Sequence, residues 1–557
     1  MGDVTRIDET ETAQFAAVPA SPEGFRPNEV SPIAAIELAE ERSNSTPDVD
    51  PLGSKVRKGA IWSALSTLIF KFANITIMAI VVRELDQKDF GVFAVAITAF
   101  TIISSFAELG VSACLIRGDV DLAKVAPTVA TIAMVSSGTL AAIMFVFAEP
   151  ISRALGSSDA DGPLRVLALA VLMVGFFAVP SAEVTRNFRQ DQQFVASVIG
   201  FVPSNALLLV MAANGGGAMS FAWSRVVGQV CVGMALIYFA KEPYRFGFSP
   251  KQAKFVLAFG LPLAGANLLN FVLLNADYAL VGRLLGEVKL ATYMLAFNIA
   301  SWSTSLLAAM INGTGLAAFS RVKDDPVRLQ RVLGKATAAI ALIALPVCSM
   351  TFVLAPDLVR TVYGDKWSAT APILTILSLY GAISLFCLLL ANVLSGLGYT
   401  RALFVVQVVW LAALVPAMTV GVHIGGVEGV AWAHIVIVLL VAMPAYLAML
   451  KRSSNVRLTP LIPAVMPAVI ASVVSAVVAA VAIRFVEGDL PRLLVGGILG
   501  GLAYAALALP TMLPLMANLS KLPPSIMQPL ERYGAFVNSM TASVQPHRYR
   551  TAGRHRV

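Results

Sequence analysis

A lysine lies at the midpoint of the first long apolar stretch of the chain, residues 60–82. Lys71 is too deep in this stretch for its side chain to reach either membrane surface at most helix tilts. A charged group in the middle of a bilayer costs about 2.5 to 3.5 kcal/mol, and such groups usually face a bundle interior or a water-filled path. We therefore expect Lys71 to line a hydrophilic cavity, where an ammonium group can form charge-assisted hydrogen bonds.

Three stripes of polar residues accompany this lysine. Helical spacing of three and four places on one face of the segment 60–82 the residues Ser63, Thr67, Lys71, Asn74 and Met78. The same spacing aligns, in the segments 255–281 and 290–312, the residues Asn267, Asn270 and Asp277, and Asn298, Ser301, Ser305 and Asn312. We expect these stripes to outline the cavity. For the lone Asn and Ser residues, hydrogen bonds between helices are the competing interpretation.

Three further ionisable residues fall inside apolar segments. Arg225 lies six residues into 219–240, so it is either an interfacial anchor or a second cation of the cavity. Asp277 is able to pair with Lys71 or Arg225, or to take up a proton. His434 is interpreted as a packed neutral ring in preference to a proton relay.

A proline flanked by glycines opens the segment 255–281, in the order Gly260, Pro262 and Gly265. Proline removes one backbone hydrogen bond and permits a helix to bend. The pattern predicts a hinge, and an ordinary kink is equally compatible with it.

The loops that could hold a reaction site are the two longest on the expected outer side, residues 148–163 and 355–370. Their acids lack paired histidines and metal-ligand spacing: Glu149, Asp159, Asp161, Asp357 and Asp365. No nucleotide-phosphate motif occurs, and the cysteines, interpreted as packing residues, are Cys114, Cys231, Cys348 and Cys387. We therefore predict a transporter and no enzyme, without catalytic residues, metal ligands or cofactors apart from a coupling proton or sodium ion.

The composition shows which elements must position these residues. Of 557 residues, 57% are hydrophobic and 13% are charged, against about 25% charged residues in soluble domains. A span needs roughly 20 apolar residues, and fourteen such stretches are expected at 60–82, 91–109, 125–147, 164–182, 194–213, 219–240, 255–281, 290–312, 333–354, 371–392, 401–422, 427–450, 461–484 and 493–515. The chain is therefore predicted to be an all-α polytopic membrane protein, and its net charge of +8 does not indicate a nucleic-acid partner.

Basic residues in the connections predict the orientation. One set of alternate connections carries roughly twenty Lys and Arg residues and the other carries nine, which places both termini in the cytoplasm. Residues 1–54 are acidic and proline-rich and are expected to be a disordered tail. Residues 516–557 form a basic tail that can contact anionic membrane lipid.

A weak repeat at an offset of 200 residues predicts two lobes. Val81, Arg83, Leu85 and Ala96 recur as Val281, Arg283, Leu285 and Ala296. Gly91, in the Phe-Gly-Val-Phe entry to the second span, belongs to the same pattern. Two pseudo-symmetric six-helix lobes around a central cavity are therefore expected at 55–240 and 241–450, followed by two extra C-terminal helices at 451–515.

The segment 58–117 closely resembles the opening of Wzx-type polysaccharide flippases. The matching residues are Arg83, Leu85, Phe90, Gly91, Phe93, Ala107, Leu109, Gly110, Leu115, Ile116 and Arg117. Residues 259–286 resemble the second hallmark of that family, and Tyr363-Gly-Asp-Lys-Trp367 with Ala371-Pro372 resembles the segment before its tenth helix. The resemblance covers about 58–450, and it implies the multidrug/oligosaccharidyl-lipid/polysaccharide exporter superfamily.

This resemblance implies a substrate and partners. The substrate would be a polyprenyl-diphosphate-linked oligosaccharide, moved from the inner to the outer leaflet of the cytoplasmic membrane for surface polysaccharide biosynthesis. A polysaccharide polymerase and chain-length proteins would be partners. Lys71 and Arg225 suit the diphosphate, whereas Asp277 matches the second hallmark without an assigned role. The N-terminal tail is longer than is usual in the family, which leaves partner docking open.

Four alternatives stay open. A cation-coupled multidrug antiporter would be favoured by acids lining the first lobe. A MurJ-like flippase of the peptidoglycan precursor would be revealed by growth arrest on depletion. A polyprenyl-linked glycosyltransferase, polymerase or ligase would need a larger outer loop with catalytic acids. A scaffold for the assembly complex would act through the tails.

Overall fold

A computed structural model describes residues 70–107, 110–116, 121–187, 189–240, 245–323, 325–454, 456–457 and 459–516. The chain divides into two units, Met1–Lys58 and Gly59–Val557, and the described residues all belong to the second. The predicted tail at 1–54 and residues 517–557 of the predicted basic tail lie outside the described residues.

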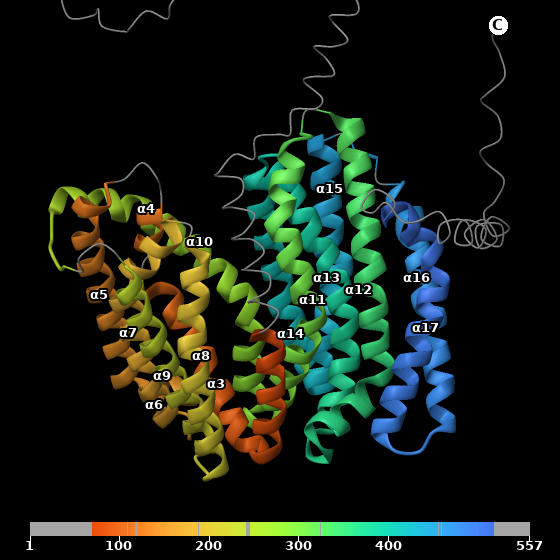
Figure 1. The fold of residues 1–557 in the computed structure, drawn as a ribbon, viewed down its shortest axis with the longest axis horizontal. Helices are drawn as coiled ribbons and strands as arrows, with labels where there is room; N and C mark the ends of the chain where they lie inside the picture. The colour runs from red at the N-terminus through yellow and green to blue at the C-terminus, as the bar shows by residue number, and fades with distance from the viewer. Residues whose placement is uncertain are drawn as a thin grey trace, which may run out of the picture. The chain divides into compact units, whose positions relative to one another are not determined.

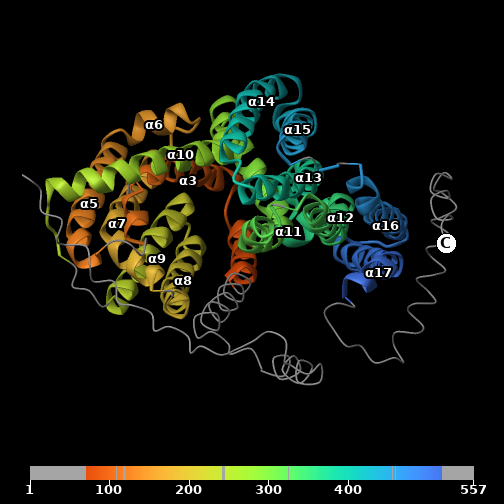
Figure 2. The same ribbon diagram turned by 90° about the horizontal axis from the view of Figure 1, so that it is seen from above.

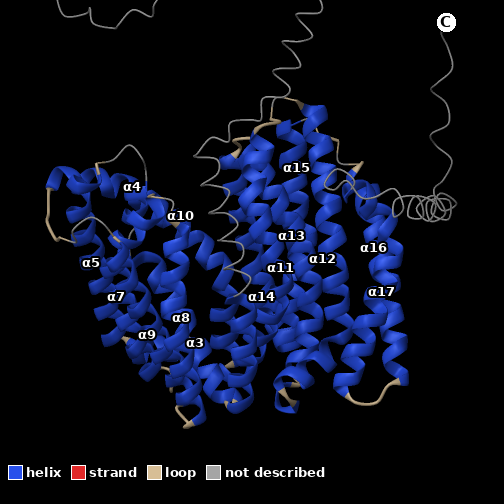
Figure 3. Ribbon diagram, in the orientation of Figure 1, coloured by secondary structure: helices blue, strands red, loops and turns tan. Residues whose placement is uncertain are grey.

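The described part of the chain consists of helices and short connections and contains no strand (Figures 1 and 3). A first helical segment runs from residue 70 to residue 84. The elements that follow are α3 (Gln87–Ala107), α4 (Val111–Ile116), α5 (Leu122–Val146), α6 (Ala148–Ala154), α7 (Asp161–Arg186), α8 (Gln190–Ala213), α9 (Gly217–Phe239), α10 (Pro250–Leu285), α11 (Glu287–Ser320), α12 (Pro326–Tyr363), η1 (Asp365–Trp367), α13 (Thr370–Gly396), α14 (Thr400–Ile437), the π-helical η2 (Val438–Ala442), α15 (Met443–Ser454), α16 (Leu461–Ala482), η3 (Ile483–Phe485) and α17 (Asp489–Met516).

Ten of the described helices or helix runs are long and apolar enough to cross a membrane, which confirms the all-α multi-span fold. One of them is the 55-residue run Thr400–Ser454. Its path leaves helical geometry at Gly425 and at Gly426, which has a φ of 56° that glycine adopts at little cost. This break falls between the predicted spans 401–422 and 427–450. The count of fourteen spans stays a prediction.

The long helices form two packed groups, which Figure 2 shows from above. The first helix group consists of α3 to α9, and the second consists of α11 to α17. The segment 70–84 lies between them, because the ring of Phe70 packs on Phe194 and Phe201 of α8, at centroid distances of 5.7 and 5.1 Å, while Lys71 bonds to α11.

α10 is shared by both groups (Figure 2). Val256, in its first half, is buried with residues of α4, α5 and α7, and Thr128 of α5 donates to Gln252 over 2.9 Å. Its second half contacts α11 and α14. The helix also packs on α3, and its end at Gly282 lies against Leu155 and Gly156 of the first helix group. The helix is continuous past Pro262, so the predicted hinge lies where α10 passes from one group to the other and stays a prediction.

Candidate functional site: a polar cavity with one arginine

A cavity of about 870 Å³ lies between the first helix group and, on its other side, the segment 70–84 and α11. Aromatic rings form part of its wall: Phe70, Phe93, Phe177, Phe201 and Phe221. Neutral polar side chains form much of the rest: Asn74, Ser181, Gln193, Ser197, Ser204, Asn205, Ser224, Gln229 and Asn298. This lining offers ring faces and many hydrogen-bonding groups to a large polar ligand.

Arg225 of α9 is the single charged residue among the described residues that line this cavity. Its guanidinium carbon lies 5.4 Å from the ring centroid of Phe100, within the range of a cation–π contact. Phe100 is buried, whereas the Arg225 side chain is exposed to the space of the cavity. The Phe100 ring thus stabilises the guanidinium through the ring face. This contact leaves the N–H groups of Arg225 available to a ligand.

Lys71 is half-buried, and its ammonium group donates a hydrogen bond to the hydroxyl of Ser305 on α11. The structure therefore brings together the polar faces predicted for the first and eighth spans. Lys71 is adjacent in sequence to Phe70 and near Asn74, which do line the cavity. The lysine itself does not belong to the described lining, and it joins the wall segment 70–84 to α11.

Asp277 lies elsewhere. Its Oδ2 accepts a hydrogen bond from the Tyr293 hydroxyl over 2.9 Å and lies 3.7 Å from Nε2 of His434. Among the described contacts, the expected pairing of Asp277 with Lys71 or Arg225 is not formed, because α10 turns this residue toward α11 and α14. The side chains of the two other residues predicted on its stripe, Asn267 and Asn270, lie outside the described part of the structure.

The predicted hinge residues occupy the middle of α10. A side chain on Gly110 would meet the carbonyl of Gly260, at 2.7 Å from an ideal Cβ, so α10 passes close to the start of α4 here. Pro262 lies inside the helix, and Gly265 faces open space.

Arg83 and its neighbours connect the end of the segment 70–84 to the end of α12. Arg83 donates from Nε to the Val362 carbonyl over 2.7 Å and from a second nitrogen to the Thr361 carbonyl. Lys366 donates to the carbonyls of Arg83 and Leu85, over 2.6 and 2.8 Å. The last carbonyls of a helix lack partners within it. Arg83 caps the last carbonyls of α12, and Lys366 of η1 caps carbonyls at the end of the segment 70–84.

Trp367 completes this contact, which we call the Arg83 interlock (Arg83, Gln87, Lys366 and Trp367 with their carbonyl partners). Its indole nitrogen donates to the Val82 carbonyl over 3.0 Å, and its ring meets Phe90 edge-on at 5.6 Å. Gln87 donates to the Lys366 carbonyl. The sequence marks Arg83 and the Tyr363–Trp367 segment as separate motifs, and the structure shows that they contact each other.

Close backbone contacts surround the interlock. A Cβ on Gly91 of α3 would lie 2.3 Å from the Glu287 carbonyl oxygen, and one on Gly156 would lie 1.8 Å from that of Gly282. Glycine is therefore required where α3 and the α6–α7 connection meet the ends of α10 and α11. Arg283, the counterpart of Arg83 in the predicted repeat, is exposed.

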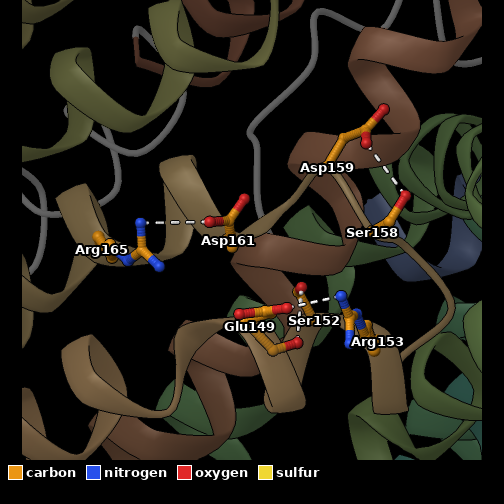
Figure 4. Close-up of polar contacts among 7 residues, drawn as sticks. All are labelled: Glu149, Ser152, Arg153, Ser158, Asp159, Asp161 and Arg165. Carbon is orange, nitrogen blue, oxygen red and sulfur yellow. Dashed lines mark hydrogen bonds and ion pairs between the residues drawn. The ribbon is translucent and has the colours of Figure 1, made fainter.

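The acids of the connection before α7 are engaged in local ion pairs (Figure 4). Glu149 pairs with Arg153 at 2.6 Å, and Asp161 pairs with Arg165 at 3.3 Å. Asp159 accepts from Ser158 at 3.0 Å and pairs with Lys88 of α3 at 2.6 Å. Hydrogen bonding to the Lys88 ammonium lowers the pKa of Asp159. Among the described residues, no group of three His, Cys, Asp or Glu side chains is placed to hold a metal ion.

Residues 80–372, more than half of the chain, match the family described as polysaccharide biosynthesis protein. The chain belongs to this family. Relatives of this polysaccharide biosynthesis protein include the lipopolysaccharide biosynthesis protein WzxC of Escherichia coli K12, 23% identical over 72% of this chain and 82% of the relative.

Two other relatives support the same assignment. The succinoglycan biosynthesis transport protein ExoT of Rhizobium meliloti is 25% identical over 69% of this chain and 76% of its own. The teichuronic acid biosynthesis protein TuaB of Bacillus subtilis is 20% identical over 69% of this chain and 80% of its own.

Solved structures show the fold that the family member adopts. The lipid II flippase MurJ in an inward closed conformation superposes with a TM-score of 0.69 over 83% of this chain and 99% of its own, at 14% identity. An inward-facing multidrug transporter of the MATE family superposes with a TM-score of 0.57 over 69% of this chain and 94% of its own, at 17% identity. At such identities the likeness concerns the fold alone.

Most of the cavity wall was not predicted from the sequence. A polar stripe runs along α8 at spacings of three and four through Gln193, Ser197, Gly200 and Ser204, and helical spacing could have revealed it. The capping partners of Arg83 could not be found in this way, because Val362 lies 279 residues away along the chain.

Proposed function

We propose that this chain is a flippase that moves a polyprenyl-diphosphate-linked oligosaccharide from the inner to the outer leaflet of the cytoplasmic membrane for surface polysaccharide biosynthesis. Membership of the polysaccharide biosynthesis protein family supports this proposal, as do relatives named for lipopolysaccharide and succinoglycan biosynthesis. The one observation that carries the proposal furthest is the cavity of about 870 Å³ with Arg225 in its wall.

The physical problem is the transfer of a diphosphate through hydrocarbon. Moving an anion from water into hydrocarbon has a prohibitive free-energy cost unless other groups replace its hydrogen bonds to water. A guanidinium donates charge-assisted hydrogen bonds that replace part of this hydration, and the neutral amides and hydroxyls of α8 and α9 can accept and donate bonds to sugar hydroxyls. The polyprenyl chain would remain in the surrounding lipid.

Alternating access would move the headgroup across. In this proposal the Arg83 interlock lies on the outer side, closes that side in the present conformation, and opens when the helix groups separate. The excess of basic residues in the opposite connections supports this orientation, with both termini in the cytoplasm. A polymerase and chain-length proteins would receive the product at the outer surface.

The multidrug antiporter is the less suitable alternative. It would be favoured by acidic residues in the wall, and Arg225 is the charged residue that the described wall contains. A flippase of the peptidoglycan precursor is distinguished by its consequence for the cell, since its depletion would stop growth, whereas loss of a surface glycan exporter leaves cell-wall synthesis running.

Substitution of the cavity arginine tests the proposal. Arg225→Ala should lower surface polysaccharide about tenfold or more at equal protein level, because a charge-assisted hydrogen bond of about 1.5 to 3 kcal/mol is lost. The measurement is surface glycan in cells lacking the native chain and expressing each variant. Arg165→Ala is the matched control, because it removes an exposed arginine that pairs only locally with Asp161. Wild-type export by the Arg225 variant would contradict the proposed role of the cavity.

A further inference from the structure

Three polar side chains from three helices meet in a buried cluster: Asp277 of α10, Tyr293 of α11 and His434 of α14. They are 2%, 0% and 4% exposed, respectively. The Tyr293 oxygen lies 2.9 Å from Oδ2 of Asp277 and 3.1 Å from Nε2 of His434. None of the three lines the 870 Å³ cavity, so the cluster is separate from the proposed substrate site.

The hydrogen bonds determine which atoms carry protons. A tyrosine hydroxyl has one hydrogen, and Tyr293 donates it to Asp277. The contact between Tyr293 and Nε2 is therefore a hydrogen bond only if Nε2 carries a proton and donates it to the Tyr293 oxygen. In a neutral ring this leaves Nδ1 of His434 as a lone-pair acceptor.

Two acceptor atoms of the cluster have no hydrogen-bond partner among the described residues. These atoms are Oδ1 of Asp277 and Nδ1 of His434. Buried acceptors without a donor are costly, and with an ionised aspartate and a neutral ring the cluster carries a net charge of −1. One added proton makes the cluster neutral and gives one of the two acceptors a bonded hydrogen.

The surroundings of the cluster offer no compensating cation among the described residues. The only basic side chain found within ion-pair distance of Asp277 in this part of the chain is His434, and a neutral imidazole does not compensate the carboxylate charge. The titratable groups that face the cluster are Tyr278 of α10 and Tyr380 of α13, and Phe297 of α11 covers the imidazole ring at 6.2 Å. An unpaired carboxylate in such a site is a strained state that a proton relieves.

A second cavity lies beside this cluster without being lined by Asp277, Tyr293 or His434. It has a volume of about 300 Å³ and is lined by Phe297, Tyr380 and residues of α11, α13 and α14. The Tyr380 ring lies 4.9 Å from the His434 ring, so one aromatic layer separates the cavity from the imidazole.

We propose that Asp277, Tyr293 and His434 form a single-proton site whose occupancy is coupled to the movement of the two helix groups. The proton comes from water, forms a bond to Oδ1 of Asp277 and leaves by breaking the same bond. Oδ1 is assigned because a neutral acid beside a neutral ring buries no charge, whereas a proton on Nδ1 would bury an opposite pair. The coupling to substrate movement rests on the proposed flippase function, and the proton site itself does not.

The placement of Asp277 gives the proton a mechanical effect. Asp277 lies in the half of α10 that packs on α11 and α14, and the other half packs on α4 and α5. Neutralising the carboxylate weakens its hydrogen bond to Tyr293, since a bond to a charged acceptor is roughly twice as strong as a neutral one. Proton binding therefore changes how firmly α10 is held by the second helix group.

Infrared difference spectroscopy of the purified protein in lipid nanodiscs tests the site without any substrate. The wild type should show a protonated-carboxyl band that increases as the pH falls, at pH values where exposed carboxylates, which titrate at about pH 4, remain ionised. Asp277→Asn should remove the titrating band, and Asp357→Asn, at another buried aspartate, should retain it. Persistence of the same titration in Asp277→Asn overturns the proposal.

A second variant tests the site even if Asp277→Asn fails to fold. Tyr293→Phe keeps the ring and removes the donor to Asp277, so the band should persist with its midpoint at higher pH by about one pH unit or more. An unmoved midpoint contradicts the cluster geometry. Titrations in sodium and in potassium chloride should coincide, and a sodium-dependent midpoint would replace the proton with a sodium ion and overturn the proposal.

Export by the same variants then tests the coupling. Asp277→Asn should lose at least about tenfold of surface polysaccharide at equal protein level, although Arg225 is intact. Normal export with a lost proton band overturns the coupling and leaves the flippase proposal standing. Normal export by Arg225→Ala with the proton band intact overturns the flippase proposal and leaves the proton site standing.

Discussion

At the scale of single residues, the side chains that matter are defined by partners far away in the sequence. Lys71 is conspicuous in the sequence because it interrupts an apolar segment, but its partner Ser305 is 234 residues away. His434 and Asp277, which the sequence places in separate spans, are linked by hydrogen bonds through the Tyr293 hydroxyl. Hydropathy indicates that a charged residue lies inside an apolar segment. It does not indicate the hydrogen-bond partner of that residue, because the partner depends on how the helices pack.

Gly91 provides a prediction about close packing. Gly91→Ala should lower stability by about 1 to 3 kcal/mol, because its methyl group would collide with the Glu287 backbone at 2.3 Å. Gly334→Ala is the matched control in α12, where nothing lies within 4 Å and alanine favours the helix. Thermal unfolding in detergent measures both, and equal midpoints would contradict the contact between α3 and α11.

At the scale of elements, the positions of the helices follow closely from apolar length, and their ends and partners do not. The predicted spans from 91–109 onward overlap the described helices from α3 to α17, and the described part of the first, 60–82, overlaps the segment 70–84. The sharing of α10 between two groups could not be predicted, because both halves of this helix are rich in apolar residues. Hydropathy does not tell which helices pack on each half. The polar wall contributed by α8 was detectable as a stripe of period near 3.6, since hydroxyl and amide side chains recur there without charge.

The ion pair between α3 and the α6–α7 connection provides a pH prediction. Because the Lys88 ammonium lowers the pKa of Asp159 in the folded chain, the pair stabilises at pH values above the unfolded pKa. This contribution is lost as the pH falls through the lower folded pKa. Thermal unfolding of wild type and Asp159→Asn should therefore differ near neutral pH and converge in acid. A Lys88→Gln background should remove the difference, and a difference that persists there would contradict the pairing.

At the scale of the whole described unit, the two helix groups are joined at the Arg83 interlock, by α10 and by the packing of α3 on α11. Transport by alternating access requires the first of these contacts to open. A Gln87→Cys, Lys366→Cys pair bridged by a short thiol cross-linker should reduce surface polysaccharide about tenfold or more, and the single-cysteine variants treated alike should export normally. Undiminished export by the fully cross-linked protein would show that the interlock need not open.

The sharing of α10 has a consequence for how force is transmitted. α10 packs on α3, α4 and α5 of the first helix group and on α11 and α14 of the second. If the two groups separate, α10 must therefore bend, slide or lose some of these contacts. The predicted hinge lies around Pro262, which cannot donate a backbone hydrogen bond within the helix. Nearby, Gly265 has open space beside it. In the proposed transport cycle, the bending stiffness of α10 around Pro262 would therefore influence how readily the two helix groups separate.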